Sequence, residues 1–100
     1  MIARRWHGRV AAEKADAYLA LMREVAIPDY QAVAGNRGAW CLHRRDGDVV
    51  HVETLTFWDD EESIRGFAGE DIAVARYYDF DDDFLIEKEP HVLHFAVIDG

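Results

Sequence analysis

Residues 53–69, ETLTFWDDEESIRGFAG, decide the fold, because their apolar pattern changes from a period of two to a helical period within a few positions. Polar and apolar side chains alternate over residues 54–58, as in a β-strand. Asp59 with Glu62 three residues later predicts a capping box at a helix start. Apolar residues then recur at helical spacing at Ile64, Phe67 and Ala68. Gly69 is suited to end this helix, so the stretch predicts a strand that leads directly into a capped helix.

Outward from this unit, the sequence predicts three more strands and another helix. We expect strands at residues 2–10, 39–45, 49–58 and 91–98, with a first helix at 12–26. Pro28 is expected to end that helix and to start a short turn. Asp46-Gly47-Asp48 predicts a hairpin between the second and third strands. Asp71 is expected to cap a second short helical piece that reaches Tyr77.

The predicted order is therefore β-α-β-β-α-β. This is the ferredoxin-like α+β fold, in which right-handed crossovers give a four-stranded antiparallel sheet of order 4-1-3-2 with helices on one face. A chain of 100 residues is expected to form a single domain, residues 1–100.

Composition excludes several classes of function. The net charge is −9, and thirteen of the twenty acidic residues follow residue 58, so the surface should repel nucleic acid and anionic membranes. No apolar run resembles a membrane span or a signal peptide, and Cys41 is a single cysteine, which favours a cytoplasmic location. The acidic run at 79–83 lacks the glycine and the terminal glutamate of a calcium loop, so no metal site and no cofactor are expected.

The apolar pattern also predicts an assembly. Helices cover only one face of such a sheet, yet both faces of the third and fourth strands carry large apolar side chains. Packing two sheets face to face would bury the uncovered one, so we expect a homodimer.

The chain resembles the antibiotic biosynthesis monooxygenase family, within the dimeric α+β barrel superfamily. The resemblance is carried by IARRWHGRV (2–10), PDYQAVAGNRG (28–38), TLTFWDDEESIRGFAG (54–69) and the pair Tyr77-Tyr78. It implies a pocket between sheet and helices that holds a small aromatic or polyketide-like substrate. It also implies a cofactor-independent monooxygenase, in which the substrate anion passes an electron to oxygen. Such a reaction needs a base, an anion stabiliser and dry aromatic walls.

Side chains at odd and even positions of a strand point to opposite faces of the sheet, and this alternation suggests candidates for these roles. In the predicted strand order, one face could bring together Arg4, Trp6, Thr54, Thr56, Trp58 and His94. His94 is the candidate base and Arg4 the candidate anion stabiliser. Trp6, Trp58, Thr54, Thr56, Phe67, Tyr77 and Tyr78 are candidates for substrate binding, with one of the two tyrosines at the pocket mouth.

Other readings of the same residues remain open. The tryptophans could be packing residues, Arg4 could pair with an acid across a dimer, and His94 could be structural. A lyase, isomerase or cyclase could use the same base without oxygen, and a non-catalytic dimeric binding module could fill the pocket with its own side chains. Haem degradation through an axial helix histidine is disfavoured, because no histidine lies between His51 and His91. His7, His43 and His51 are expected at solvated or interface positions.

Overall fold

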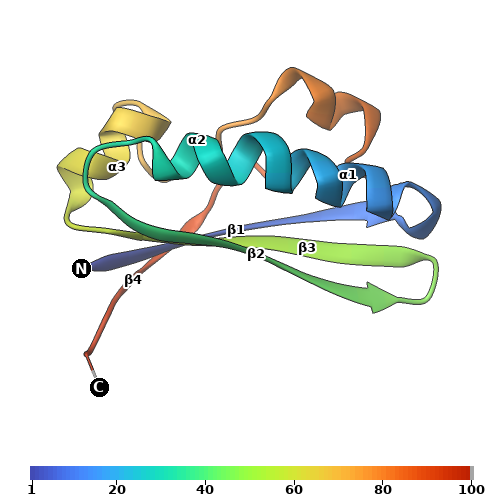
Figure 1. Cartoon of the computed structure of the whole chain (residues 1–100), viewed down its shortest axis with the longest axis horizontal. Helices are drawn as coiled ribbons and strands as arrows, with labels where there is room; N and C mark the ends of the chain where they lie inside the picture. Colours follow the sequence, from blue (N-terminus) through green and yellow to red (C-terminus); the bar gives the residue numbers. More distant parts are fainter. Residues whose placement is uncertain (100) are drawn as a thin grey trace.

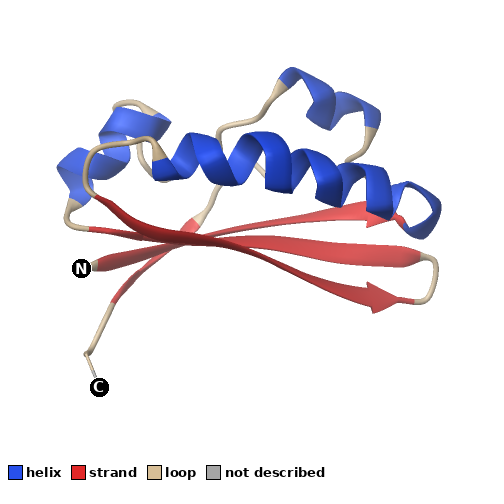
Figure 2. Ribbon diagram, viewed as in Figure 1, coloured by secondary structure: helices blue, strands red, loops and turns tan. Residues whose placement is uncertain are grey.

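The four strands form one antiparallel sheet in the order β2-β3-β1-β4, which is the predicted order 4-1-3-2. The computed structural model describes residues 1–99. The strands are β1 (Ile2–Ala11), β2 (Asn36–Asp46), β3 (Val49–Trp58) and β4 (Leu93–Ala96). Figure 1 shows the helices lying along one side of the sheet, and Figure 2 shows the resulting two layers of helix and strand. The fold is α+β and ferredoxin-like, as predicted.

The helical layer covers the sheet face that carries the even-numbered residues of β1 and β3. It contains a short 3-10 turn η1 (Ala12–Lys14), α1 (Ala15–Leu21), a π-helical turn η2 (Met22–Ala26), α2 (Ile27–Gln31) and α3 (Glu61–Ala68). A further 3-10 turn, η3 (Asp79–Asp83), lies in the connection to β4. The core between the layers includes Val10, Tyr18, Met22, Val52, Trp58 and Ile64, each at most 3% exposed.

The first helix does not end at Pro28, contrary to the prediction. It continues as α2 to Gln31, and the turn before the proline widens so that the Ile27 N–H bonds to the Met22 carbonyl, five residues back. Proline has no N–H and its ring crowds the carbonyl of the preceding turn, so a widened π turn lets the helix pass through it.

The cap of α3 lies one residue later than predicted. Asp60, not Asp59, is the N-cap: its carboxylate accepts the Ser63 N–H at 2.9 Å, and Ser63 Oγ accepts the Asp60 N–H at 3.3 Å. Asp59 instead pairs with Arg37 from the start of β2. Gly69, with φ of 90°, ends the helix as predicted.

The predicted helical piece from Asp71 to Tyr77 is absent from the described residues. A single turn forms at Asp71, and Val74 then pairs with His91 as an isolated bridge. Two backbone bonds of 2.9 Å, Ala75 to Pro90 and Val92 to Ala73, hold this segment extended. Because His91 pairs here, β4 begins at Leu93 rather than at His91.

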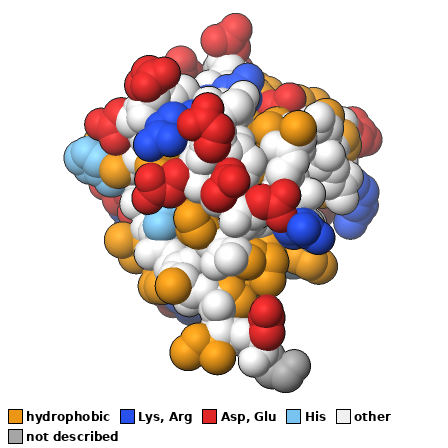
Figure 3. All heavy atoms as spheres, turned by 90° about the vertical axis from the view of Figure 1, so that its left-hand side faces the viewer, with side chains coloured by type: hydrophobic (Ala, Val, Ile, Leu, Met, Phe, Trp, Pro, Cys, Tyr) orange, Lys and Arg blue, Asp and Glu red, His pale blue; other side chains and the backbone are white. Residues whose placement is uncertain are grey.

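The other face of the sheet carries no helix among the described residues. Large apolar side chains are about half exposed on it: Trp40, Leu42, Leu93 and Phe95, at 47–56%. In Figure 3, hydrophobic side chains gather over the lower, sheet side of the molecule and acidic side chains over the upper, helical side. We call this uncovered surface the open face.

Candidate functional site

The strand register brings the predicted site residues onto one face of the sheet. On β1, Arg4 lies opposite Thr56 of β3 and opposite His94 of β4. Trp6 lies opposite Thr54, and Ile2 opposite Trp58. Antiparallel partners share a face, so the predicted convergence is confirmed, and the shared face is the one beneath the helices.

Arg4 is a buried guanidinium without an acidic partner. The residue is 2% exposed, and among residues 1–99 no carboxylate lies within ion-pairing distance of it. Its Nη2 donates to the Val74 carbonyl at 3.1 Å, and its guanidinium carbon lies 5.5 Å from the centre of the Phe67 ring. Burial lowers the pKa of Arg4, and its Nε has no hydrogen-bond partner. A buried charge of this kind is costly to leave uncompensated.

His94 supplies a second polar atom without a partner. Its Nε2 is buried and makes no hydrogen bond. Burial lowers the pKa of His94, and the positive charge of Arg4 lowers it further. The imidazole is therefore held in its neutral form, which can accept a proton. A neutral base on β4 thus lies opposite a cation on β1, on the same face of the sheet, and the cation has no carboxylate partner. An acidic ligand would supply both a proton for the base and a negative charge for the cation.

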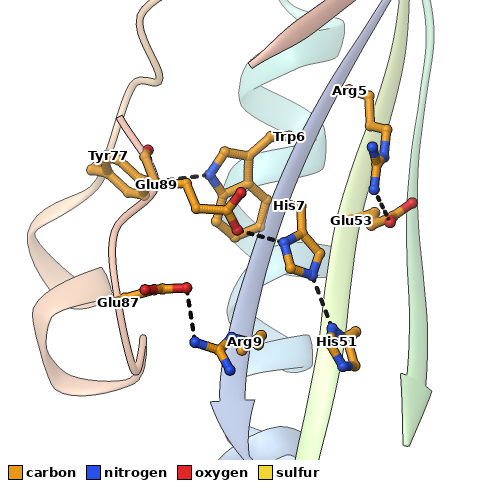
Figure 4. A network of polar contacts seen from close by, with 9 residues as sticks. All are labelled: Arg5, Trp6, His7, Arg9, His51, Glu53, Tyr77, Glu87 and Glu89. Atoms are coloured by element: carbon orange, nitrogen blue, oxygen red, sulfur yellow. Dashed lines mark hydrogen bonds and ion pairs between the residues drawn. The ribbon is translucent and has the colours of Figure 1, made fainter. Parts of the chain in front are cut away.

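Aromatic side chains fill the layer around these two residues. Trp6 donates its indole N–H to the Tyr77 hydroxyl at 3.2 Å, and Tyr77 donates to the Glu89 carbonyl at 2.5 Å (Figure 4). Trp58 is fully buried and donates its indole N–H to Thr56 Oγ1 at 2.8 Å. Both indole N–H groups of these walls are therefore hydrogen-bonded within the protein.

Phe67 of α3 is the centre of the aromatic cluster. Its ring lies 4.6 Å from that of Tyr30 and 6.1 Å from that of Trp58, measured between ring centres. Arg76 lies over the same ring at 4.7 Å. Tyr30 and Arg76 were not among the predicted site residues. Tyr30 follows the buried helix positions at 18, 22 and 26 at a spacing of four, which could have indicated it.

The two tyrosines have different surroundings. Tyr77 lies beside Trp6, whereas Tyr78 donates its hydroxyl to Asp29 of α2 at 2.6 Å and stacks on Phe80. Burial raises the pKa of both hydroxyls. Thr54 lies deeper, with its hydroxyl 3.3 Å from that of Tyr30. Tyr77 is therefore the tyrosine that contacts the predicted aromatic wall.

Hollows on the surface are lined by residues other than Arg4 and His94. One of about 490 Å³ on the open face is lined by Arg5, His7, Leu42, His43, Arg44, His51 and Glu53. Another of about 300 Å³ lies between the first helix and β2, where Cys41 has a pKa raised by burial to about 11. A ligand at Arg4 would have to displace side chains that now fill the inner layer.

A second polar cluster on the open face was missed by the sequence reasoning. His51, expected to be solvated near the hairpin, is partly buried, and its Nδ1 lies 2.9 Å from His7 Nε2, with 5.2 Å between the ring centres. Glu89, from the connection to β4, completes this cluster (Figure 4). Spacing along the chain gave no signal for it, because the two histidines come from different strands.

Within residues 1–99, no group of three or more His, Cys, Asp or Glu side chains is placed to hold a metal ion. The helices of this part of the chain are all too short or too polar to cross a membrane.

Comparison with known proteins supports the fold. No protein-family model matches the chain, and no curated protein matches its sequence. Among solved structures it is similar to Rv0793 from Mycobacterium tuberculosis, with a TM-score of 0.60 and 14% sequence identity over 100% of this chain and 98% of that one. At this level of identity the similarity shows a shared fold and nothing about activity.

Proposed function

We propose that this chain is a small cofactor-independent monooxygenase of the antibiotic biosynthesis monooxygenase type, acting on an acidic aromatic or polyketide-like substrate. The observation that carries the proposal is the pairing of Arg4 with His94. Arg4 brings an uncompensated positive charge to the inner face, and His94 brings a neutral base with an open ring nitrogen. A phenol that loses its proton to His94 becomes the anion that Arg4 lacks.

The proposed reaction balances without a further reductant. His94 takes the phenolic proton, and the phenolate transfers one electron to O₂. The resulting phenoxyl radical and superoxide combine to form a carbon-bound peroxide. Loss of water then gives the quinone, so one oxygen atom enters the product, the other leaves as water, and the substrate supplies all the electrons. The imidazolium of His94 can return its proton to the departing hydroxide.

The surroundings of Arg4 favour a flat substrate. Phe67 presents its aromatic ring to the guanidinium, with 5.5 Å between the guanidinium carbon and the ring centre, and such a ring excludes water from a charged intermediate. The Val74 carbonyl now accepts the Arg4 N–H, so a phenolate oxygen would replace it there. The irregular segment at 71–77 is consequently the part of the chain that has to move when a substrate binds.

One observation favours a non-catalytic binding module instead. The aromatic walls are already satisfied: Trp58 is fully buried and Trp6 is 6% exposed, with both indole N–H groups hydrogen-bonded. A packed interior of this kind needs no ligand for stability. The two readings differ in whether oxygen is consumed when a ligand binds.

Oxygen uptake with a panel of phenols and polycyclic hydroxy-aromatics, in buffer containing a chelator, tests the proposal. We expect one O₂ consumed per substrate, and a rate about 10²–10⁴-fold lower for His94→Gln. His43→Gln, which changes an exposed histidine on β2, is the matched control and should keep the parental rate. Binding without oxygen uptake would favour an isomerase, cyclase or binding module, and equal phenolate affinity of wild type and Arg4→Met would contradict the proposed site.

The proposal includes a homodimer. The open face leaves Leu93 and Phe95 of β4 and Trp40 of β2 about half exposed, more apolar surface than a lone sheet face usually leaves in water. Acidic side chains gather on the opposite, helical side, so charge repulsion does not oppose contact between two open faces (Figure 3). A second copy of this chain is the proposed occupant.

A further inference from the structure

The outer side of β2 has no partner strand in this chain. β2 stands first in the sheet order β2-β3-β1-β4, so it pairs only with β3. Within residues 1–99, the backbone groups of residues 39–46 make no hydrogen bond outside the ladder with β3. The strand is 11 residues long, and such an edge is a template for pairing with another extended chain.

A groove follows this edge on the helical side of the sheet. Its volume is about 300 Å³, the lower end of the range for ligand pockets. The lining includes one flank of the first helix and alternate residues of β2: Leu19, Arg23, Ile27, Ala39, Cys41 and His43. We call it the edge groove.

The edge groove is not covered in the proposed homodimer. Cys41 lies opposite Thr54 of β3, which bonds to Tyr30 of α2 and so belongs to the face beneath the helices. Side chains alternate along a strand, so residues 39, 41 and 43 point to the helical side. Trp40 and Leu42 belong to the open face. Two copies that meet through their open faces therefore leave the edge groove in contact with solvent.

The charge around the edge groove is opposite to that of the whole chain. The net charge of the chain is −9, yet the groove lining contains Arg23 and His43 and no acidic residue. Neither Arg23 nor Arg45, near the end of β2, contacts a carboxylate among the described residues. Residues 36–46 hold three arginines and one aspartate. The edge therefore attracts an acidic chain, and it disfavours the β2 of a second copy, which carries the same arginines.

The inner surface of the edge groove is apolar. Leu19, Ile27 and Cys41 are partly buried, and Ala39 is 9% exposed. The two residues on the strand side are small, which leaves room between β2 and the helix. An extended chain paired with β2 would direct every second side chain into this space. Apolar side chains of moderate size, such as valine, suit it.

We propose that β2 and the edge groove bind an extended acidic peptide segment of a partner protein, which adds a fifth strand to the sheet. Backbone hydrogen bonds to residues 39–46 supply affinity, and the groove selects apolar side chains at alternate positions. Arg23 and Arg45 select acidic residues among the others. This site is independent of the proposed oxygenase site, because Arg4 and His94 do not line the groove.

Fluorescence anisotropy with a labelled peptide tests the proposal. The probe alternates glutamate and valine and is as long as residues 39–46. The comparison peptide has lysine in place of every glutamate. We expect the glutamate peptide to bind at least about 10-fold more tightly than the lysine peptide, and the difference to shrink as salt is added.

Two variants with matched controls locate the contacts. Arg23→Gln removes an exposed charge and should weaken binding of the glutamate peptide by about 2–5-fold, whereas Arg65→Gln on α3 should not. Ile27→Glu places a negative charge in the groove and should weaken binding at least about 10-fold. Val25→Glu, on the same helix but outside the groove lining, should keep the affinity within about 2-fold. Circular dichroism checks that Ile27→Glu is folded, and Arg23→Gln provides the test if it is not.

Hydrogen exchange read by mass spectrometry shows where the peptide binds. Outward-facing amides of residues 39–46 should exchange at least about 10-fold more slowly when the glutamate peptide is bound. Four results would overturn the proposal: no binding at millimolar peptide, equal affinity for the lysine peptide, protection confined to residues outside 36–46, or an unchanged affinity in Arg23→Gln. Protection of residues 39–46 that rises with protein concentration in the absence of peptide would also overturn it, because a second copy would then occupy the edge.

Discussion

At the scale of the residue, Arg4 is a buried cation whose placement costs stability, because it has no carboxylate partner among the described residues. The neighbouring Arg5 on the open face has a carboxylate partner, Glu53, at 2.6 Å, whereas the buried Arg4 has only a carbonyl and an aromatic ring. A residue that costs stability without compensation is a candidate for function, because binding can provide the missing partner.

Arg4→Met should therefore leave the free energy of unfolding unchanged or raise it by up to about 4 kcal/mol, since a buried charge is exchanged for apolar volume. Urea denaturation measures this. Arg5→Met is the matched control, for which an exposed ion pair predicts a change of at most about 1 kcal/mol. A loss of more than about 2 kcal/mol in Arg4→Met would mean that Arg4 is a structural residue.

His94 makes stability and activity depend on pH in a defined direction. Burial and Arg4 lower its pKa in the folded state, so as the pH falls below about 6.5 the unfolded chain takes up the proton first. This difference in proton uptake lowers the free energy of unfolding in acid. The loss reaches its full size once the pH is below the pKa of His94 in the folded state.

Comparing the unfolding free energy of wild type and His94→Gln from about pH 7.5 down to pH 5 isolates this contribution, because the other titrating groups are common to both. The advantage of the variant should grow as the pH falls. Turnover of a substrate, once found, should rise with pH through an apparent pKa below about 6.5. A parallel fall of the two stability curves would show that His94 has no lowered pKa.

At the scale of the element, alanine substitutions at two glycines are expected to change the stability in opposite directions and so to test the packing around the site. A Cβ on Gly8 of β1 would come within 2.5 Å of the Trp6 ring and 2.9 Å of Leu85. Gly66 lies inside α3, where a Cβ would meet only Val33, at 3.4 Å.

Gly8→Ala should therefore destabilise the fold by about 1–3 kcal/mol through overpacking. Gly66→Ala should stabilise it by about 0.5–1 kcal/mol, because alanine loses less conformational freedom in a helix. Thermal denaturation of both variants checks the pair. A stable Gly8→Ala protein would show that the Trp6 ring can move away from the strand.

Most of the fold was predictable from the sequence, and the differences have local causes. The Asp-Gly hairpin, the alternation along β1 and β3 and the end of α3 at Gly69 depend on short-range preferences, and the structure confirms them. The π turn before Pro28 lets the helix continue through the proline, an outcome that the usual helix-ending effect of proline does not indicate. The extended segment at 71–77 is set by pairing with residues 90–92, a contact between distant parts of the chain.

The residues of the candidate site could be predicted from the sequence as far as the alternation of side chains between the two faces of a strand determines them. This alternation places Arg4 and Trp6 on a different face of the sheet from their neighbours on the strand. Only the register shows that Arg4 lies opposite His94. The pair His7 and His51 could not be found, because its members are 44 residues apart and meet only through the register of β1 and β3. Neither the register nor a contact across strands can be read from periodicity.

At the scale of the whole molecule, the two sides of the sheet have different characters. The helical side carries the core, Arg4 and His94, with acidic side chains outside it (Figure 3). The open face is apolar around Leu93 and Phe95 and polar around His7 and Glu53. An isologous contact brings the same patch of two copies together, so apolar regions near the axis could cover one another.

We therefore expect light scattering at micromolar concentration to give a mass twice the 11.5 kDa of one chain. Phe95→Asp, which places a charge on the open face, should give a monomer. Val25→Asp is the matched control: Val25 is 39% exposed, comparable to Phe95 at 48%, but it lies on the helical layer, so the variant should stay dimeric. If wild type is a monomer, or if Val25→Asp dissociates while Phe95→Asp does not, the contact surface lies elsewhere on the molecule.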